Sequence, residues 1–145
     1  MVDDNCLFCR IVTGELAATV VYEDANSVAF LDHRPLFHGH TLLVPREHIE
    51  TLADLPTPLI GPYFEAAQLL SRAIQTGLDA EGTFVAMNNR VSQSVPHFHV
   101  HVVPRRKKDG LKGFFWPRTK YKDDEEMKTV QAKIVAALKK AKTEK

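Results

Sequence analysis

The sequence has few cysteines and no long apolar segment. Cys6 and Cys9 are its only cysteines, and two cysteines cannot build the disulfide framework of a small secreted domain. No apolar run approaches the roughly 18 residues that a membrane-spanning helix needs. Residues 1–6 are polar and acidic, whereas a signal peptide begins with basic residues that apolar ones follow. We therefore expect a cytoplasmic protein with no membrane partner.

The length and the composition indicate one folded domain. The chain has 145 residues, of which 44% are hydrophobic and 26% are charged. These values are ordinary for a soluble globular protein, and a domain typically has roughly 100–200 residues. We expect residues 1–145 to form a single domain, which excludes a two-domain enzyme and a disordered chain.

A formal net charge of +1 conceals an uneven distribution of charge. Residues 1–103 carry five basic and twelve acidic side chains, whereas residues 104–145 carry fourteen basic and six acidic ones. A basic C-terminal segment is typical either of an arm that binds an anionic partner or of an exposed, lysine-rich helix face. We favour the helix face, and we expect no nucleic-acid partner.

Short apolar runs and two helical patterns predict an α+β fold. Segments rich in β-branched and apolar residues, separated by turn residues, predict five strands. The predicted strands cover residues 19–23, 27–32, 41–45, 83–87 and 98–103. Apolar residues at intervals of three and four predict a helix from Pro56 to about Thr76 and a second helix that begins at Asp123. The short connections favour an antiparallel sheet with the helices on one side.

Three of the seven histidines alternate with apolar residues in the last predicted strand. Successive side chains of a β-strand point to opposite faces, so His97, His99 and His101 share one face. The apolar residues between them pack on the other face. A partly buried row of imidazoles requires a metal, an anion, or hydrogen bonds that hold neutral tautomers. A simply solvated histidine face is the less favoured alternative.

Two kinds of chemistry are compatible with this row of histidines. A His-x-His pair on a strand, with a third ligand, is typical of zinc enzymes that keep an open position for water. Alternatively, an imidazole nitrogen attacks phosphorus and forms a covalent phosphoryl-histidine. The polar loop before the strand offers Asn88, Gln93 and Ser94 as hydrogen-bond donors for phosphate oxygens. The residues alone leave both alternatives open.

Four segments of the sequence resemble the histidine triad (HIT) family. The segment from Gln93 to Val103 resembles the family signature, in which three histidines alternate with apolar residues. Residues 6–9 (Cys-Leu-Phe-Cys), 28–32 (Val-Ala-Phe-Leu-Asp) and 39–48 (Gly-His-Thr-Leu-Leu-Val-Pro-Arg-Glu-His) resemble further family segments in the same order. The resemblance covers residues 6–104, and residues 105–145 lie outside the shared signature.

The resemblance implies a fold and a type of reaction. The HIT-like fold is a five-stranded antiparallel sheet with two helices, and related proteins form homodimers. Family members hydrolyse or transfer a nucleotidyl group, usually adenylyl, through a covalent nucleotidyl-histidine intermediate. Dinucleoside polyphosphates and adenosine phosphoramidates are substrates of this kind. The alternative is a nucleotide-binding or partner-binding protein with little turnover.

The resemblance assigns three catalytic residues. His99, the middle histidine, corresponds to the family nucleophile. His101 corresponds to a residue that contacts the phosphate oxygens. Ser94 or Gln93 corresponds to a residue that bonds phosphate oxygens and assists the leaving group. The resemblance therefore implies His99, His101 and Ser94 as catalytic residues.

The resemblance also implies residues that bind the nucleoside and the α-phosphate. Asp32 corresponds to the acid that holds the ribose hydroxyls, and His33 either stacks on the base or is an exposed loop histidine. The amide near the α-phosphate is Asn88, or Asn89, because the loop is shorter than in other family members. His40 is expected to support the fold and not to belong to the site.

The C-x-x-C motif indicates metal binding or redox chemistry in a reducing compartment. Many bacterial HIT proteins with this motif bind a structural zinc, and the resemblance implies Cys6, Cys9, His48 and His97 as the matching ligands here. Two thiolates and two imidazoles form a closed tetrahedral zinc site that has no open position for water. A loose dithiol without metal is the alternative.

Overall fold

The structure is a computed structural model, and it describes residues 1–112 and 117–143. The chain divides into two compact units, Met1–Asp109 and Gly110–Lys145. The first unit contains the sheet and every residue that the sequence predicts for the site. The expectation that residues 1–145 form a single domain stays a prediction.

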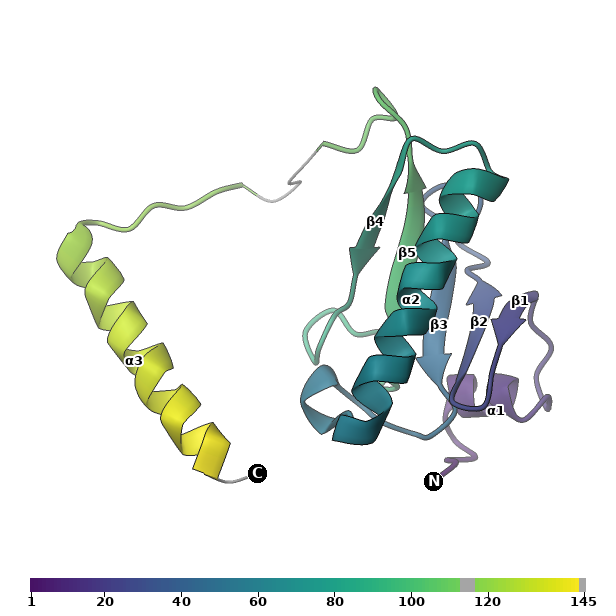
Figure 1. Cartoon of the computed structure of the whole chain (residues 1–145), viewed down its shortest axis with the longest axis horizontal. Coiled ribbons are helices and arrows are strands. Elements are labelled where there is room, and N and C mark those ends of the chain that lie inside the picture. The colour runs from purple at the N-terminus through teal and green to yellow at the C-terminus, as the bar shows by residue number, and fades with distance from the viewer. Residues whose placement is uncertain (113–116, 144–145) are drawn as a thin grey trace. The chain divides into compact units, whose positions relative to one another are not determined.

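A five-stranded antiparallel sheet forms the centre of the first unit and confirms the predicted fold class. The strands are β1 (Val20–Glu23), β2 (Ser27–Leu31), β3 (Thr41–Pro45), β4 (Gly82–Ala86) and β5 (Val100–Arg105). Their order in the sheet is β1-β2-β3-β5-β4 (Figure 1). Because β5 lies between β3 and β4, the strand that carries the histidines is an interior strand.

Helix α2 (Thr57–Gly77) covers one face of this sheet (Figure 1). It follows a short 3₁₀ helix, η1 (Leu52–Asp54), and begins where Pro56 and Pro58 suit a first turn. Its buried face packs against apolar side chains of β2, β3 and β5, and the Tyr63 hydroxyl donates a hydrogen bond of 2.7 Å to the Leu43 carbonyl. Burying one large apolar side chain contributes about 1.5–3 kcal/mol, so this face supplies much of the stability of the unit.

A second helix, α1 (Leu7–Val12), packs on the opposite face of the sheet, where the sequence predicts no helix. The buried side chains of Phe8 and Cys9 pack with Val28, Phe30 and the other apolar residues of β2 and β3 that point to this face. Together they form a second apolar cluster. The expectation that helices lie on one side only is therefore corrected. A helix of six residues is too short to show an apolar period, which is why the sequence pattern does not reveal it.

The histidine segment enters the sheet later than predicted. Strand β5 begins at Val100, so His97, Phe98 and His99 lie before it, outside the regular strand. The alternation nevertheless holds, because Phe98, Val100 and Val102 are fully buried in the cluster under α2. The imidazoles therefore face the side of the sheet that α1 covers, as the ring contacts of Phe8 with His97 and His99 also show.

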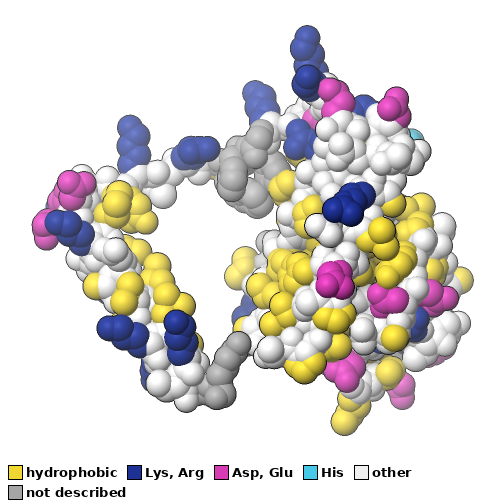
Figure 2. All heavy atoms as spheres, in the orientation of Figure 1, with side chains coloured by type: hydrophobic (Ala, Val, Ile, Leu, Met, Phe, Trp, Pro, Cys, Tyr) yellow, Lys and Arg dark blue, Asp and Glu magenta, His cyan; other side chains and the backbone are white. Residues whose placement is uncertain are grey.

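The second unit contains the predicted C-terminal helix, α3 (Asp124–Thr143). Its first turn is acidic and its last turn carries Lys140 and Lys142, which complements the helix dipole at both ends. No residue of α3 is buried, and Figure 2 shows basic and apolar side chains exposed along it. No helix in the described part of the chain is long and apolar enough to cross a membrane.

Candidate functional site

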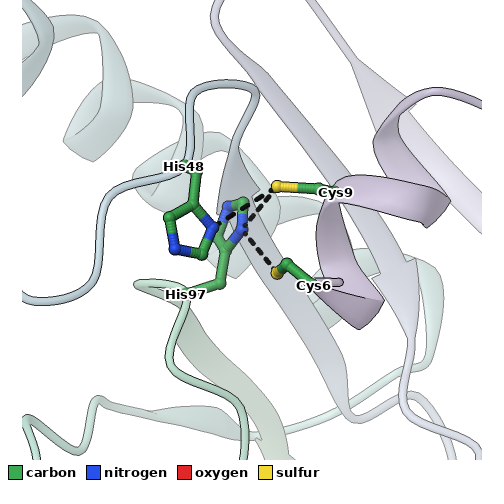
Figure 3. Close-up of side chains that lie close together, drawn as sticks. All are labelled: Cys6, Cys9, His48 and His97. Atoms are coloured by element: carbon green, nitrogen blue, oxygen red, sulfur yellow. Dashed lines mark hydrogen bonds between the residues drawn. The ribbon is translucent and has the colours of Figure 1, made fainter. Parts of the chain in front are cut away.

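Four side chains that can ligate a metal converge from three segments of the first unit (Figure 3). Cys6 and Cys9 lie at α1, His48 follows β3, and His97 precedes β5. The Sγ atoms of Cys6 and Cys9 lie 3.4 and 3.5 Å from His97 Nδ1, and Cys9 Sγ lies 3.4 Å from His48 Nδ1. All four donor atoms lie within 4.8 Å of one another. The structure thus brings together all four predicted metal ligands.

The spacing and the chemistry of these donors fit zinc. Zinc bonds of about 2.3 Å to sulfur and about 2.0 Å to nitrogen, in a tetrahedron, place sulfur and nitrogen about 3.5 Å apart. The observed separations of 3.4–3.5 Å match that value. His97 donates its Nε2–H to the Pro45 carbonyl at 2.8 Å, which leaves the Nδ1 lone pair directed toward the sulfurs. Burial lowers the pKa of His97 to about 4, so this imidazole is neutral at pH 7.

Burial also acts on the thiols of this group. Cys9 is fully buried and Cys6 is 6% exposed. Burial raises the pKa of the Cys9 thiol, which favours its protonated form when no cation is near. A divalent cation offsets that effect and stabilises the thiolate. The four protein donor atoms would fill all four coordination positions of a tetrahedral ion. This group can therefore hold a structural ion, but it leaves no coordination position for a substrate.

His99 is held in one tautomer by the backbone. Its Nδ1 lies 2.8 Å from the His97 carbonyl oxygen, which can only accept, so the proton of the neutral ring sits on Nδ1. The Nε2 lone pair is therefore free to attack an electrophile. Burial lowers the pKa of His99, and this keeps the imidazole neutral at physiological pH. The Phe8 ring packs edge-on against the imidazole, with 5.1 Å between the ring centroids.

A chain of hydrogen bonds fixes the tautomer of His101. The Leu36 backbone N–H donates to His40 Nδ1 at 3.1 Å, so the proton of neutral His40 sits on Nε2. That Nε2–H donates to His101 Nδ1 at 2.9 Å, which leaves the His101 proton on Nε2. Burial lowers the pKa of His40 and lowers that of His101 to about 4, so both rings are neutral. His101 therefore presents a hydrogen-bond donor at Nε2.

The three triad histidines do not form one metal site. Asp32, His40 and His101 offer donor atoms close enough for an ion, but a hydrogen bond already occupies the space between the two rings. His97 directs Nδ1 to the cysteines, and His99 gives its Nδ1 proton to a carbonyl. The geometry therefore counts against a zinc hydrolase that uses the triad itself as ligands.

A cavity of about 570 Å³ lies beside His99 and His101. Its polar lining combines these two histidines with Asp32, His33 and Ser94, which are all predicted site residues, and with Thr19. Its apolar lining comes from α1, from β2 and β3, and from residues 16–18 before β1. The volume and the mixed lining suit a small molecule that has one apolar and one polar end.

In the polar loop after β4, side-chain amides form hydrogen bonds with backbone groups. Gln93 Nε2 donates to the Glu50 carbonyl at 2.6 Å, and its Oε1 accepts from the Arg90 backbone N–H at 2.8 Å. Asn89 Oδ1 accepts from the Leu52 backbone N–H at 2.8 Å. Asn88 is exposed. Neither asparagine nor Gln93 is among the residues that line the cavity, and their assignment to the phosphate stays a prediction.

The sequence pattern did not predict two of the residues at the site. His40, expected only to support the fold, contacts His101 directly, and Phe8 from the unpredicted helix lines the cavity. The signal for His40 is the antiparallel pairing of β3 with β5, where Thr41 lies opposite Val102. In that register, His40 lies beside the end of the histidine row. The sequence alone does not reveal this position, because it depends on which strands are paired.

Comparison with known proteins identifies the family. The sequence model of the HIT domain matches residues 13–108. "Protein hit" of Bacillus subtilis is 37% identical over 115 residues, which cover 78% of this chain and 79% of that protein. The chain belongs to the HIT family.

Two relatives carry names that state an activity. "Adenylylsulfatase HINT3" of Arabidopsis thaliana is 34% identical over 74% of this chain and 56% of its own length. "Adenosine 5'-monophosphoramidase HNT1" of Saccharomyces cerevisiae is 33% identical over 75% of this chain and 68% of its own length.

Solved structures match the fold over most of the chain. A HIT family protein from Bacillus subtilis superposes with a TM-score of 0.82 and 33% identity, covering 92% of this chain and 96% of that one. A zinc-bound histidine triad family protein from Mycobacterium smegmatis superposes with a TM-score of 0.71 and 35% identity, covering 92% of this chain and 97% of that one.

Proposed function

We propose that this protein is a hydrolase or transferase that cleaves adenylyl-type nucleotides at the α-phosphate through a covalent nucleotidyl-His99 intermediate. The observation that carries the proposal is the tautomer of His99. Its Nδ1 proton is bound by the His97 carbonyl, so Nε2 is left as a free nucleophile at the cavity. Adenosine phosphoramidates and dinucleoside polyphosphates are the proposed substrates. The names of the Arabidopsis and yeast relatives support this substrate class.

The first step forms a phosphorus–nitrogen bond. The Nε2 lone pair of His99 attacks the α-phosphorus while the bond from phosphorus to the leaving group breaks. The Nε2–H of His101 donates to a nonbridging phosphate oxygen and stabilises the developing charge. Ser94 lies at the cavity and is proposed to give the leaving amine or phosphate its proton through the hydroxyl.

The second step restores the enzyme. Water, or the hydroxyl or amine of another acceptor in a transfer reaction, attacks the same phosphorus from the side that the leaving group vacated, and its proton passes to the Ser94 oxygen and restores that hydroxyl. The bond between phosphorus and Nε2 breaks, the nucleotide leaves, and His99 regains its neutral form.

Asp32 is proposed to accept hydrogen bonds from the ribose hydroxyls, and His33 is proposed to contact the base, since both line the cavity. Asn88 and Gln93 are proposed to donate hydrogen bonds to phosphate oxygens.

We also propose that Cys6, Cys9, His48 and His97 hold a structural zinc ion, supported by the fit of the donor set and by the zinc-bound relative. When bound, the ion crosslinks the segments that carry its ligands. The thiolates that it needs persist in a reducing compartment, which accords with the expected cytoplasmic location. The homodimer that the resemblance implies also stays a prediction.

The direct test is to trap the intermediate. Wild-type protein is mixed with an adenosine phosphoramidate, quenched in acid-free denaturant within a second, and weighed by intact-protein mass spectrometry. We expect the mass of one adenylyl group on the wild type, mapped by peptide fragmentation to His99. Bound nucleotide that dissociates on denaturation, with no adduct and no turnover, would instead identify a nucleotide-binding protein.

The pH dependence of the reaction offers a second test. Protonated His99 has no lone pair for attack, so the rate falls as the pH drops through its pKa in the folded protein. Burial lowers that pKa below 6.5, and it lowers the pKa of His101 to about 4. We expect kcat to stay constant from pH 8 to below pH 6.5 and to decline only at lower pH. The measurement is kcat against pH in a buffer of constant ionic strength.

The charge of Asp32 provides a control for this profile. The carboxylate raises the pKa of both His99 and His101, opposing the larger effect of burial. Asp32→Asn is therefore expected to move the acid limb to still lower pH, whatever it does to substrate affinity. An acid limb at or above pH 6.5 in the wild type would contradict the buried, neutral state of the nucleophile.

A further inference from the structure

Helix α1 belongs to both sites. Cys6 and Cys9 supply two of the four metal-ligating atoms, and Leu7, Phe8 and Ile11 of the same helix line the cavity. The backbone between the two cysteines therefore carries residues of the cavity wall. A displacement of the sulfurs has to displace this wall.

Phe8 makes the contacts that join the two sites. It is 5% exposed, and its ring packs edge-on against the metal-ligating His97, with 5.9 Å between centroids. The same ring packs against His99 at 5.1 Å and against Phe30 of β2 at 5.4 Å. One side chain thus touches a metal ligand, the proposed nucleophile and the apolar floor of the cavity.

The helix depends on these contacts for its position. It has six residues and no side-chain hydrogen bond at its N-cap, and an isolated helix of that length is unstable in water. The buried residues that fix it to the sheet are Phe8 and the two cysteines. The cysteine sulfurs face imidazole nitrogens, so an ion bound to these four donor atoms would crosslink α1 to the segments that carry the two histidines.

We propose that metal binding and nucleotide binding are thermodynamically coupled through Phe8, so that the ion at Cys6, Cys9, His48 and His97 raises the affinity of the cavity for nucleotide. Phe8 is a positioning residue, since it orients the His99 ring and the α1 wall without touching phosphorus. This inference rests on the proposed function, because it takes the cavity as the nucleotide site. By linkage, nucleotide must raise the affinity for zinc by the same factor.

The experiment measures both halves of the linkage on intact protein. Zinc affinity is determined by chelator competition, with and without saturating AMP, and AMP affinity is determined by calorimetry on zinc-loaded and zinc-stripped protein. We expect AMP to tighten zinc binding roughly tenfold, within the usual range of coupling between sites. The zinc competition starts from the loaded protein, so it remains valid if stripping unfolds the chain.

Two variants of α1 separate coupling from simple damage to the helix. Phe8→Ala is expected to keep zinc but to reduce the coupling factor to about one. Val12→Ala removes a partly buried side chain of the same helix that does not line the cavity, and its coupling factor is expected to match the wild type. A nitrogen-15 spectrum of the His99 ring should change on zinc removal in the wild type and not in Phe8→Ala.

The possible failures point to different conclusions. A zinc affinity that does not change with saturating AMP overturns the coupling and leaves the proposed function intact. Full coupling in Phe8→Ala overturns the role of Phe8. If zinc-loaded wild type binds no AMP at all, the proposed function itself fails.

Discussion

Replacing His99 with glycine is expected to lower kcat for an adenosine phosphoramidate by about four orders of magnitude or more, the scale of effect found when a nucleophile is removed from an enzyme. The substitution deletes the only group proposed to bond to phosphorus. The cavity keeps Asp32, His33, Ser94 and His101, so the affinity for AMP should change by less than about tenfold. The measurements are steady-state turnover and calorimetric titration with AMP.

The control for this variant addresses folding. His99 is only 3% exposed, so its removal opens a buried space and costs stability. Zinc content and cooperative thermal unfolding should nevertheless persist, because His99 supplies no metal ligand. His38→Gly makes the same chemical change at an exposed histidine outside the cavity and should leave kcat unaltered. Turnover by His99→Gly within tenfold of the wild type would exclude His99 as the nucleophile.

Loss of the metal is expected to have the largest effect on stability. An ion present at about 1,000 times its dissociation constant stabilises the folded state by about 4 kcal/mol. Stripping zinc with a chelator, or replacing Cys9 with serine, should therefore lower the melting temperature by roughly 10 °C. Thermal unfolding followed by circular dichroism, together with metal analysis of the purified protein, measures both the effect and the stoichiometry.

An internal control distinguishes metal loss from damage to the core. Cys9 is fully buried, so serine at this position also places a hydroxyl in an apolar cluster. If the metal accounts for the loss of stability, the chelator destabilises the wild type but has no further effect on Cys9→Ser. Protein that contains no zinc and melts at the same temperature with and without chelator would indicate the loose dithiol.

Strand alternation explains why much of the fold and of the site could be predicted from the sequence. The period of two in the histidine row separated His97, His99 and His101 from Phe98 and Val100 without knowledge of any partner strand. Strands β1, β2 and β3 are likewise local patterns of apolar residues. The four candidate metal-ligating residues were predicted from the resemblance to the HIT family, because Cys6, Cys9, His48 and His97 stand at the positions that hold zinc in bacterial members.

Features that arise from tertiary contacts could not be predicted in this way. Helix α1 is too short to have a period, and it is stabilised by burial of Phe8 against β2. The role of His40 depends on the register of β3 against β5. The hydrogen bond from the Gln93 amide to the Glu50 carbonyl spans a sequence separation that local patterns do not encode, and the assignment of Gln93 to the phosphate stays a prediction.

The tautomer of the nucleophile is controlled by the main chain of residue 97 and not by its side chain. The carbonyl of His97 accepts the Nδ1 proton of His99, while the His97 imidazole faces the cysteines. Every amino acid has that carbonyl, so a substitution at position 97 removes a metal ligand but still leaves the acceptor for His99. A substitution at position 97 is therefore expected to abolish the proposed metal binding, whereas the tautomer of His99 does not depend on the side chain at that position.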